Sequence, residues 1–255
     1  MSRILLNVDI GERGPDHAED RDLLRYVDIA NIACGGHAGS AQSVDRFRTL
    51  AENAGIEVTA HVSYPDRAHF GRRTIQMPFA QLRVSLDAQL AMMPGIRAVK
   101  CHGALYNDCC WDPQLANELA AWMATSGISR VLTLPGSELD RACQSLGIRV
   151  VPEAFAERRY AYCGVSRRLS LVPRTESFAS IIDVEEALEQ ARTMIQRQQV
   201  RALHSDSKDL SQARFVDLEM DTLCIHSDSP IAVDLAMGVA KLLKESALPP
   251  DRRAS

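Results

Sequence analysis

Residues 4–12 read ILLNVDIGE, an apolar run of strand length that ends in the acidic residues Asp9 and Glu12. Similar runs end in ionisable groups five more times: Ile29–Ala33 before Cys34 and His37, Glu57–Ala60 before His61, Ala98–Val99 before Lys100 and His102, Val150–Val151 before Glu153, and Leu223–Ile225 before His226 and Asp228. Polar residues scattered over a surface would not recur at the ends of successive apolar runs. Parallel strands would produce this pattern, because their carboxyl ends converge at one face of a barrel. The pattern therefore predicts a single site built from these groups.

Segments with helical spacing and helix-ending glycines or prolines lie between the strands. We predict helices over residues Asp20–Tyr26, Ala41–Ala54, Pro78–Met92, Asp112–Trp122, Ser137–Leu146, Val184–Gln196 and Pro230–Glu245. A seventh strand is expected at Val131–Leu134 and an eighth near Val200–Leu203. This alternation predicts an α/β fold, a (β/α) barrel with about seven parallel strands. We expect a single domain over residues 1–246 and a flexible tail at 247–255.

Composition places the chain among ordinary globular proteins. Of its 255 residues, 46% are hydrophobic and 24% charged, and the net charge of −4 comes from mixed signs, so we expect no nucleic-acid partner. No apolar run approaches the roughly 20 residues that span a bilayer, and the first residues do not resemble a signal peptide, so we expect a cytoplasmic protein and no membrane contact. The seven cysteines include no C-x-x-C pair, which favours buried, reduced thiols.

Side chains two positions apart on a strand point to the same side. This places Asn7 with Asp9, Lys100 with His102, and Cys224 with His226. Each residue alone is as well explained by a turn or by a core histidine. Burying all of these ionisable side chains together would cost folding free energy, so their joint occurrence favours a functional site.

Two stretches are long for connections between strands and helices, Ser63–Met77 and Ala156–Thr175, and we interpret them as lid or binding loops. Arginine suits the bidentate recognition of carboxylate or phosphate. We assign that role to Arg72, Arg73 and Arg174. For Arg158, Arg159, Arg167 and Arg168 the sequence favours a solvated loop.

Motifs for other chemistry are absent from the sequence. There is no G-x-x-x-x-G-K-[ST] or G-x-G-x-x-G, so any ATP must be held by another device or another chain. No G-x-S-x-G elbow is present. Aspartate with two or three histidines suits zinc, yet no H-E-x-x-H or H-x-x-x-H pair occurs, and a protein-bound metal stays an open question.

At these same residues the chain resembles the LamB/YcsF family, the A subunits of 5-oxoprolinases. The resemblance rests on NVDIGE (7–12), ANIACGGHAG (30–39), H-x-x-YPD (61–66), FGRR (70–73), K-x-HGALYN (100–107), LPGSELDRA (134–142), EAFAERRY (153–160), LVPR (171–174) and IHSDSP (225–230). It implies a distorted seven-stranded barrel related to the glycoside hydrolase/deacetylase superfamily. It also implies a cytoplasmic reaction, the ATP-dependent opening of 5-oxo-L-proline (pyroglutamate) to L-glutamate, together with partner subunits B and C.

On this basis we assign roles. The predicted catalytic residues are Asp9, Glu12, Lys100, His102, Glu153 and His226. The predicted substrate-binding residues are Asn7, His37, His61, Tyr64, Arg72, Arg73, Tyr106, Arg174 and Asp228. Asp9 or Glu153 would orient or deprotonate water, while Lys100, His102 and His226 would stabilise developing negative charge.

The expected ligands are a small lactam and ATP, with Mg²⁺ as a possible companion of ATP, and a homodimer is possible. Two alternatives remain open. One is a metal-dependent amide hydrolase or deacetylase that acts without ATP. The other is a non-catalytic subunit that binds the lactam for its partners.

Overall fold

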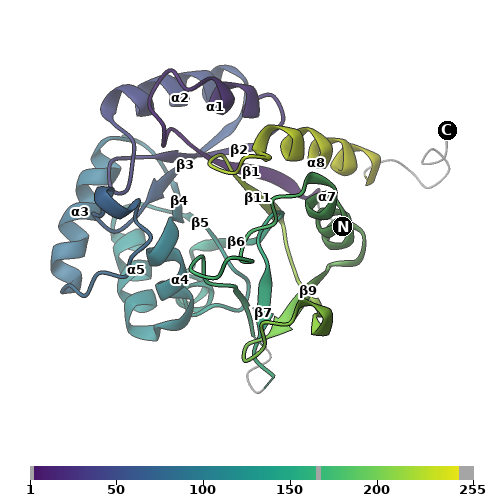
Figure 1. Ribbon diagram of the computed structural model, residues 1–255. Helices are drawn as coiled ribbons and strands as arrows, with labels where there is room; N and C mark the ends of the chain where they lie inside the picture. Colours follow the sequence, from purple (N-terminus) through teal and green to yellow (C-terminus); the bar gives the residue numbers. More distant parts are fainter. Residues whose placement is uncertain (1–2, 165–167, 247–255) are drawn as a thin grey trace.

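Seven parallel strands close into a barrel in the order β1-β11-β6-β5-β4-β3-β2, in a computed structural model that describes residues 3–164 and 168–246 (Figure 1). The strands are β1 (Leu5–Ile10), β2 (Ile29–Ala33), β3 (Glu57–Val62), β4 (Ala98–Cys101), β5 (Arg130–Thr133), β6 (Arg149–Phe155) and β11 (Thr222–His226). The predicted barrel of about seven parallel strands is confirmed. The predicted tail at 247–255 lies outside the described residues.

The strand register places the polar strand ends side by side. Asp9 on β1 is paired with His226 on β11 and with Asn31 on β2. On the other side of the barrel, His61 on β3 is paired with Lys100 on β4. Residues far apart in the sequence therefore meet at the carboxyl end of the barrel.

Helices surround the barrel (Figure 1). They are α1 (Ala18–Leu23), α2 (Ala41–Asn53), α3 (Phe79–Ala91), α4 (Gly103–Trp111), α5 (Pro113–Thr125), α6 (Glu138–Ser145), α7 (Val184–Arg197) and α8 (Ala232–Ser246). All but α4 match a predicted helix within a few residues. The α4 segment shows no amphipathic stripe, because Ala104–Tyr106 are consecutive and all buried.

A second sheet lies beside the barrel, in the order β10-β9-β7-β8. It consists of β7 (Tyr160–Tyr162), β8 (Leu169–Leu171), β9 (Gln199–His204) and β10 (Arg214–Asp217). Short 3-10 helices occur at Arg67–His69 and Leu210–Gln212. The strand expected near Val200–Leu203 exists as β9, and it belongs to this second sheet rather than to the barrel. Since β11 pairs directly with β6, the barrel closes without it.

The barrel interior is layered. Leu5, Ile29, Leu132 and Val151 form a small apolar cluster of their own, separate from the large core beneath the helices. Two residues further along their strands come Asn7, Asn31 and Glu153, all fully buried. Because inward-facing positions alternate along a strand, the apolar cluster supports a polar layer directly beneath the strand ends.

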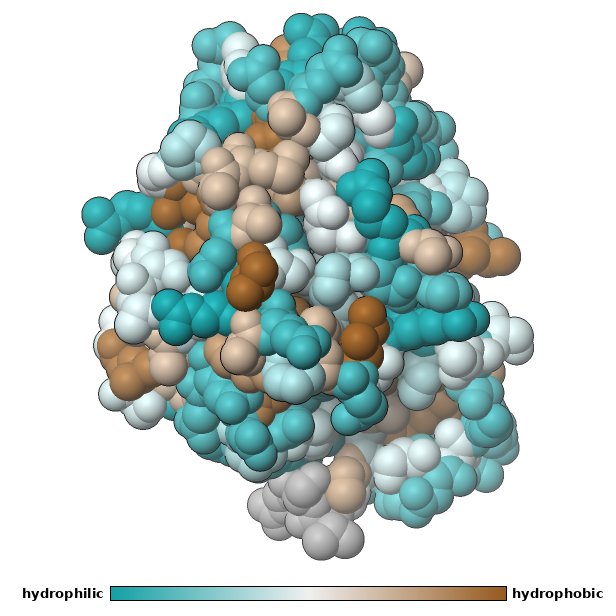
Figure 2. Space-filling view, turned by 90° about the vertical axis from the view of Figure 1, so that its left-hand side faces the viewer, coloured by the Kyte–Doolittle hydropathy of each residue, from teal (hydrophilic) through white to brown (hydrophobic). Residues whose placement is uncertain are grey.

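One face of the molecule is mostly polar (Figure 2). Figure 2 shows the face over the α3 side as largely hydrophilic, with apolar side chains in small groups. Over the described ranges, no helix combines the length and the apolar character needed to cross a membrane. Six of the seven cysteines are buried, as predicted, and no disulfide joins the described residues.

Gly39, in the loop that follows His37, provides a test of how this loop is packed. Its φ is +85°, and an added Cβ would lie 2.1 Å from the Ala33 carbonyl oxygen. We expect Gly39→Ala to lower the free energy of unfolding by about 2–5 kcal/mol, from left-handed strain together with the clash. Urea denaturation measures the change.

Gly127→Ala is the matched control, because Gly127 has φ +76° and no atom within 4 Å of an added Cβ. It should cost only the conformational strain, about 1–2 kcal/mol. Equal losses in the two variants would contradict the close packing at Gly39.

Candidate active site

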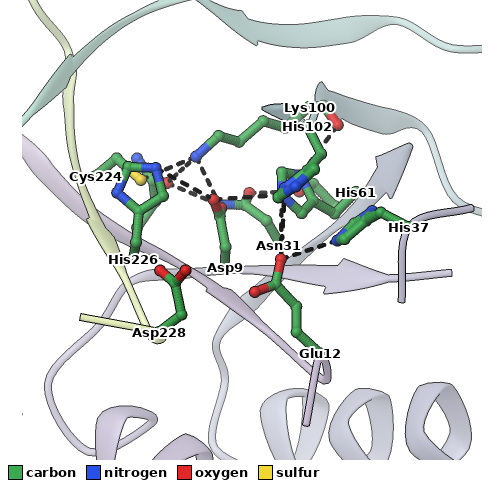
Figure 3. Close-up of polar contacts among 12 residues, drawn as sticks. Asp9, Glu12, Asn31, His37, His61, Lys100, His102, Cys224, His226 and Asp228 are labelled. Carbon is green, nitrogen blue, oxygen red and sulfur yellow. Dashed lines mark hydrogen bonds and ion pairs between the residues drawn. The ribbon is translucent and has the colours of Figure 1, made fainter. Parts of the chain in front are cut away.

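The ionisable strand ends surround one cavity of about 180 Å³ at the carboxyl end of the barrel. Of the predicted residues, those that line it are Asp9, His61, Arg72, Lys100, His102, Tyr106, Arg174 and His226. Figure 3 shows Asp9 from β1, His61 from β3, and Lys100 and His102 from the end of β4 converging on one point. The sequence predicted this convergence from the phase of its strand ends.

Lys100 is the buried centre of the site. Its Nζ lies 2.8 Å from Asp9 Oδ1 and 2.8 Å from Glu153 Oε1, and it donates to Cys224 Sγ at 2.9 Å. Burial alone would lower the pKa of Lys100, but the negative charges around it, chiefly Asp9, outweigh burial and raise the pKa well above its ordinary value. Lys100 is therefore a fixed positive charge at the floor of the cavity.

The two carboxylate oxygens of Asp9 face different partners. Its Oδ1 accepts hydrogen bonds from Lys100 Nζ and, at 2.8 Å, from Asn31 Nδ2. Its Oδ2 lies 3.3 Å from His61 Nε2 and 4.0 Å from His226 Nε2. Burial raises the pKa of Asp9, yet His61 and Lys100 more than compensate and hold it well below its usual range. Asp9 is ionised.

His61 and His102 face each other. His61 Nδ1 lies 3.2 Å from the Lys100 carbonyl oxygen, and His102 Nε2 lies 2.9 Å from the Phe70 carbonyl oxygen. Their remaining nitrogens, His61 Nε2 and His102 Nδ1, are 3.0 Å apart. Burial lowers the pKa of His102 well below its ordinary value, so this ring is neutral.

Glu12 and His37 form a neutral pair behind these rings. His37 Nε2 lies 2.9 Å from Glu12 Oε1, and the His37 ring stacks on His102 with centroids 3.6 Å apart. Burial raises the pKa of Glu12 to about 8 and lowers the pKa of His37 to about 3. Near pH 7 the pair is a carboxylic acid and a neutral imidazole.

His226 is oriented by a residue to which the sequence analysis gave no role. Glu157 Oε1 lies 2.6 Å from His226 Nδ1 and also accepts the His226 backbone N–H at 2.8 Å. Glu157 is buried directly after β6, in the stretch EAFAE. Asn31 was missed as well. Its signal was a polar side chain at an inward-facing position of an otherwise apolar strand.

Arginines line the rim of the cavity. Arg174 is exposed there, and Arg72, also at the rim, forms an ion pair with Asp228. Arg158 corrects a prediction, because it is 3% exposed rather than solvated. Its Nη2 donates to the Val172 carbonyl at 2.7 Å, and burial and the neighbouring Arg174 lower its pKa to about 9.

The other arginines of that stretch are nearer the prediction. Arg159 and Arg168 are partly exposed and pair with Glu186 and Glu138. Arg167 lies outside the described residues.

Several predicted residues lie outside the cavity lining. Asn7 donates to Thr222 Oγ1 in the polar layer, and Glu153 Oε1 lies against Lys100 Nζ. Tyr64 donates to Asp108 Oδ2 and faces a neighbouring groove, whereas Arg73 is exposed. These four residues, like Glu12, His37 and Asp228, are not part of the cavity lining.

Metal-type donors also gather at this site. In the part of the chain that the structure describes, Glu12, His37, His61 and His102 form one such group, and Asp9, Cys224 and His226 form another. In each group the donor atoms lie within 4.8 Å of one another. No sequence spacing revealed either group as a metal site, since apart from Cys224 and His226, which share β11, the members come from different strands and loops.

The buried position of Lys100 gives a signed prediction. Lys100→Met removes the charge that holds the pKa of Asp9 down, so two buried carboxylates are left without a cation. We expect a loss of about 3–5 kcal/mol at pH 7.5. An uncompensated buried carboxyl folds best when protonated, so the deficit should shrink as pH falls toward about 4. Urea denaturation across pH measures this.

Lys208→Met is the matched control, because Lys208 pairs with Glu176 on the surface with 73% of its side chain exposed. It should leave stability nearly unchanged at every pH. A pH-independent deficit in Lys100→Met would contradict the proposed charge balance.

Comparison with known proteins places the chain in a family. A sequence model of the LamB/YcsF family matches residues 4–251. The crystal structure of a lactam utilization protein from Thermus thermophilus is 32% identical, covers 96% of this chain and 97% of its own, and superposes with a TM-score of 0.78. A family 4 carbohydrate esterase from Streptomyces lividans is 11% identical over 95% of this chain and 88% of its own, with a TM-score of 0.40. The match over nearly the whole sequence shows that this chain belongs to the LamB/YcsF family.

Proposed function

We propose that this protein is the lactam-binding catalytic subunit of an ATP-dependent 5-oxoprolinase, which opens 5-oxo-L-proline to L-glutamate. The observation that carries the proposal is one small cavity with ionised Asp9 and Lys100 at its floor and arginines at its rim. Family membership and the resemblance to a lactam utilization protein support the substrate class. Association with subunits B and C in the cytoplasm is part of the proposal.

The cavity suits a small ring that carries a carboxylate. Its volume of about 180 Å³ lies below the roughly 300–1,000 Å³ typical of sites for drug-sized ligands. Arg174 and Arg72 offer guanidinium groups for the substrate carboxylate. Within the described residues Arg174 has no protein hydrogen bond or ion pair, and Arg158 beside it has its pKa lowered partly by Arg174, so an anion is favoured there.

The chemistry follows from the floor residues. Transfer of the γ-phosphoryl group of ATP to the lactam oxygen, with release of ADP, would remove the amide resonance that protects the ring. Addition of water to the activated carbon and cleavage of the ring C–N bond, with a proton taken up by the nitrogen, would leave an acyl phosphate, which a second water hydrolyses to L-glutamate and inorganic phosphate. Asp9, which lines the cavity and whose Oδ1 is held by Lys100 and Asn31, would orient the attacking water through Oδ2. Lys100 would stabilise the negative charge that develops on the oxygen. His226 would present Nε2, because Glu157 holds its Nδ1.

Neither the sequence nor the cavity offers a recognisable binding site for ATP. The sequence has no phosphate-binding loop, and the cavity is small for a nucleotide beside a lactam. We therefore assign part of the ATP site to the partner subunits.

A metal-dependent amide hydrolase acting without ATP is the second candidate, favoured by the grouping of Glu12, His61 and His102. It predicts ring opening by the isolated chain without ATP. A purely lactam-binding subunit instead predicts that substrate binding persists when Asp9 is changed.

Asp9→Asn tests the catalytic assignment. The amide keeps the shape of the side chain but loses the charge, so we expect phosphate release that depends on 5-oxoproline to fall at least about 100-fold in kcat in the complex reconstituted with subunits B and C. Asp206→Asn, at a surface residue with 85% of its side chain exposed, should match the parent. Unchanged turnover in Asp9→Asn would refute the role of Asp9.

Arg174→Gln tests recognition of the carboxylate. Loss of one charge-assisted hydrogen bond should raise KM for 5-oxoproline about 10–100-fold. KM for pyrrolidin-2-one, which lacks the carboxylate, should not change. Arg73→Gln, at an exposed arginine outside the cavity, is the matched control. Equal effects of Arg174→Gln on both lactams would show that Arg174 does not read the carboxylate.

A further inference from the structure

We propose that the site binds a divalent transition-metal ion of the zinc type, held by His61 Nε2, His102 Nδ1 and Glu12 Oε1. The three donors lie at the ends of different strands and point toward a common centre (Figure 3). The inference goes beyond the proposed function, which needs no metal in the protein.

The tautomers of His61 and His102, that is, which ring nitrogen carries the proton, follow from their backbone contacts. A carbonyl oxygen only accepts hydrogen bonds, so His61 Nδ1 and His102 Nε2, each next to a backbone carbonyl, carry the ring protons. His61 Nε2 and His102 Nδ1 then present lone pairs to each other at 3.0 Å. Two lone pairs at this distance repel unless a cation or a proton lies with them.

The surrounding geometry favours a metal ion, because two carboxylate oxygens also lie close to these two nitrogens. Glu12 Oε1 is 3.5 Å from His102 Nδ1, and Asp9 Oδ2 is 3.3 Å from His61 Nε2. Backbone carbonyls that fix the outer nitrogen of a histidine, so that the inner nitrogen faces a metal, are a recurrent feature of metal sites. Here both histidines have this arrangement.

The donor separations fit four-coordinate binding. Zinc–nitrogen and zinc–oxygen bonds of about 2.0–2.1 Å place tetrahedral ligands roughly 3.3–3.4 Å apart. Glu12 Oε1 lies 3.5 Å from His102 Nδ1 and 3.9 Å from His61 Nε2, and the two histidine nitrogens are 3.0 Å apart. These three separations lie on both sides of the expected value. Asp9 Oδ2, 3.3 Å from His61 Nε2, is the nearest further donor.

His37 takes a supporting place. Its ring is parallel to that of His102, with an interplanar angle of 2°, so the two lone pairs cannot both aim at one ion. Its Nε2 instead reaches Glu12 Oε1 at 2.9 Å, which suits a ring that orients the carboxylate. Glu12 would release its carboxyl proton when the ion binds. The resulting set of two imidazoles and one carboxylate favours zinc, cobalt or a related ion over magnesium or calcium.

Such an ion would stand next to the lactam cavity, since His61, His102 and Asp9 also line it. A Lewis acid there could polarise a carbonyl oxygen or bind water. Binding of the metal and opening of the lactam are separate measurements, so either proposal can fail while the other stands.

The test uses the purified full-length chain, stripped with chelator and titrated with Zn²⁺ by calorimetry and with Co²⁺ by absorption. We expect one equivalent of either ion and the visible bands of four- or five-coordinate cobalt. A near-ultraviolet thiolate charge-transfer band would instead assign the ion to the group with Cys224 and overturn the proposed ligand set. This readout on the parent protein needs no variant to fold.

Variants locate the site. His61→Gln and His102→Gln should each weaken Zn²⁺ binding at least about 100-fold, while His37→Gln, which can still donate to Glu12, should weaken it about 10-fold. His204→Gln, at an exposed histidine, should bind like the parent. Absence of stoichiometric binding by the parent, or unchanged affinity in both His61→Gln and His102→Gln, would overturn the proposal.

Discussion

The ammonium of Lys100, buried between Asp9 and Glu153, is the interaction on which the rest of the site depends. Two carboxylates inside a barrel would be costly without a cation, and a cation would be costly without them. The ion pair with Lys100 helps to fix Asp9 in its charged form. Asn7, Asn31 and Thr222 add hydrogen bonds beside this centre.

Much of this arrangement followed from the sequence, because strand ends in a parallel barrel converge wherever the strands are correctly identified. Asp9, His61, His102 and His226 were found in this way. The resemblance to a family reinforced the barrel but could not say which of these residues touch a cavity. That depends on how the side chains pack: Glu153 is enclosed against Lys100, and Arg73, in the loop after β3, lies in solvent.

The features that the sequence did not predict, among them the burial of Arg158 and the role of Glu157, depend on contacts between distant parts of the chain. In the sequence, Arg158 is one of several loop arginines with nothing to distinguish it. Its buried guanidinium is stabilised by hydrogen bonds to the backbone carbonyls of Val172 and Ala179, which come from a later segment of the chain. Glu157 acts through a partner 69 positions away. The strand β9 has an ordinary apolar pattern, so only the direct pairing of β6 with β11 excludes it from the barrel.

The pairing of β1 with β11, which closes the barrel, has a consequence for how the chain folds during its synthesis. Asp9 sits beside His226, so the first strand finds its second neighbour only after nearly the whole polypeptide has been made. Contacts of such long sequence separation form late and slowly. A nascent chain on the ribosome therefore exposes the edges of its early strands, and it acquires a working site in one closing event rather than by stages.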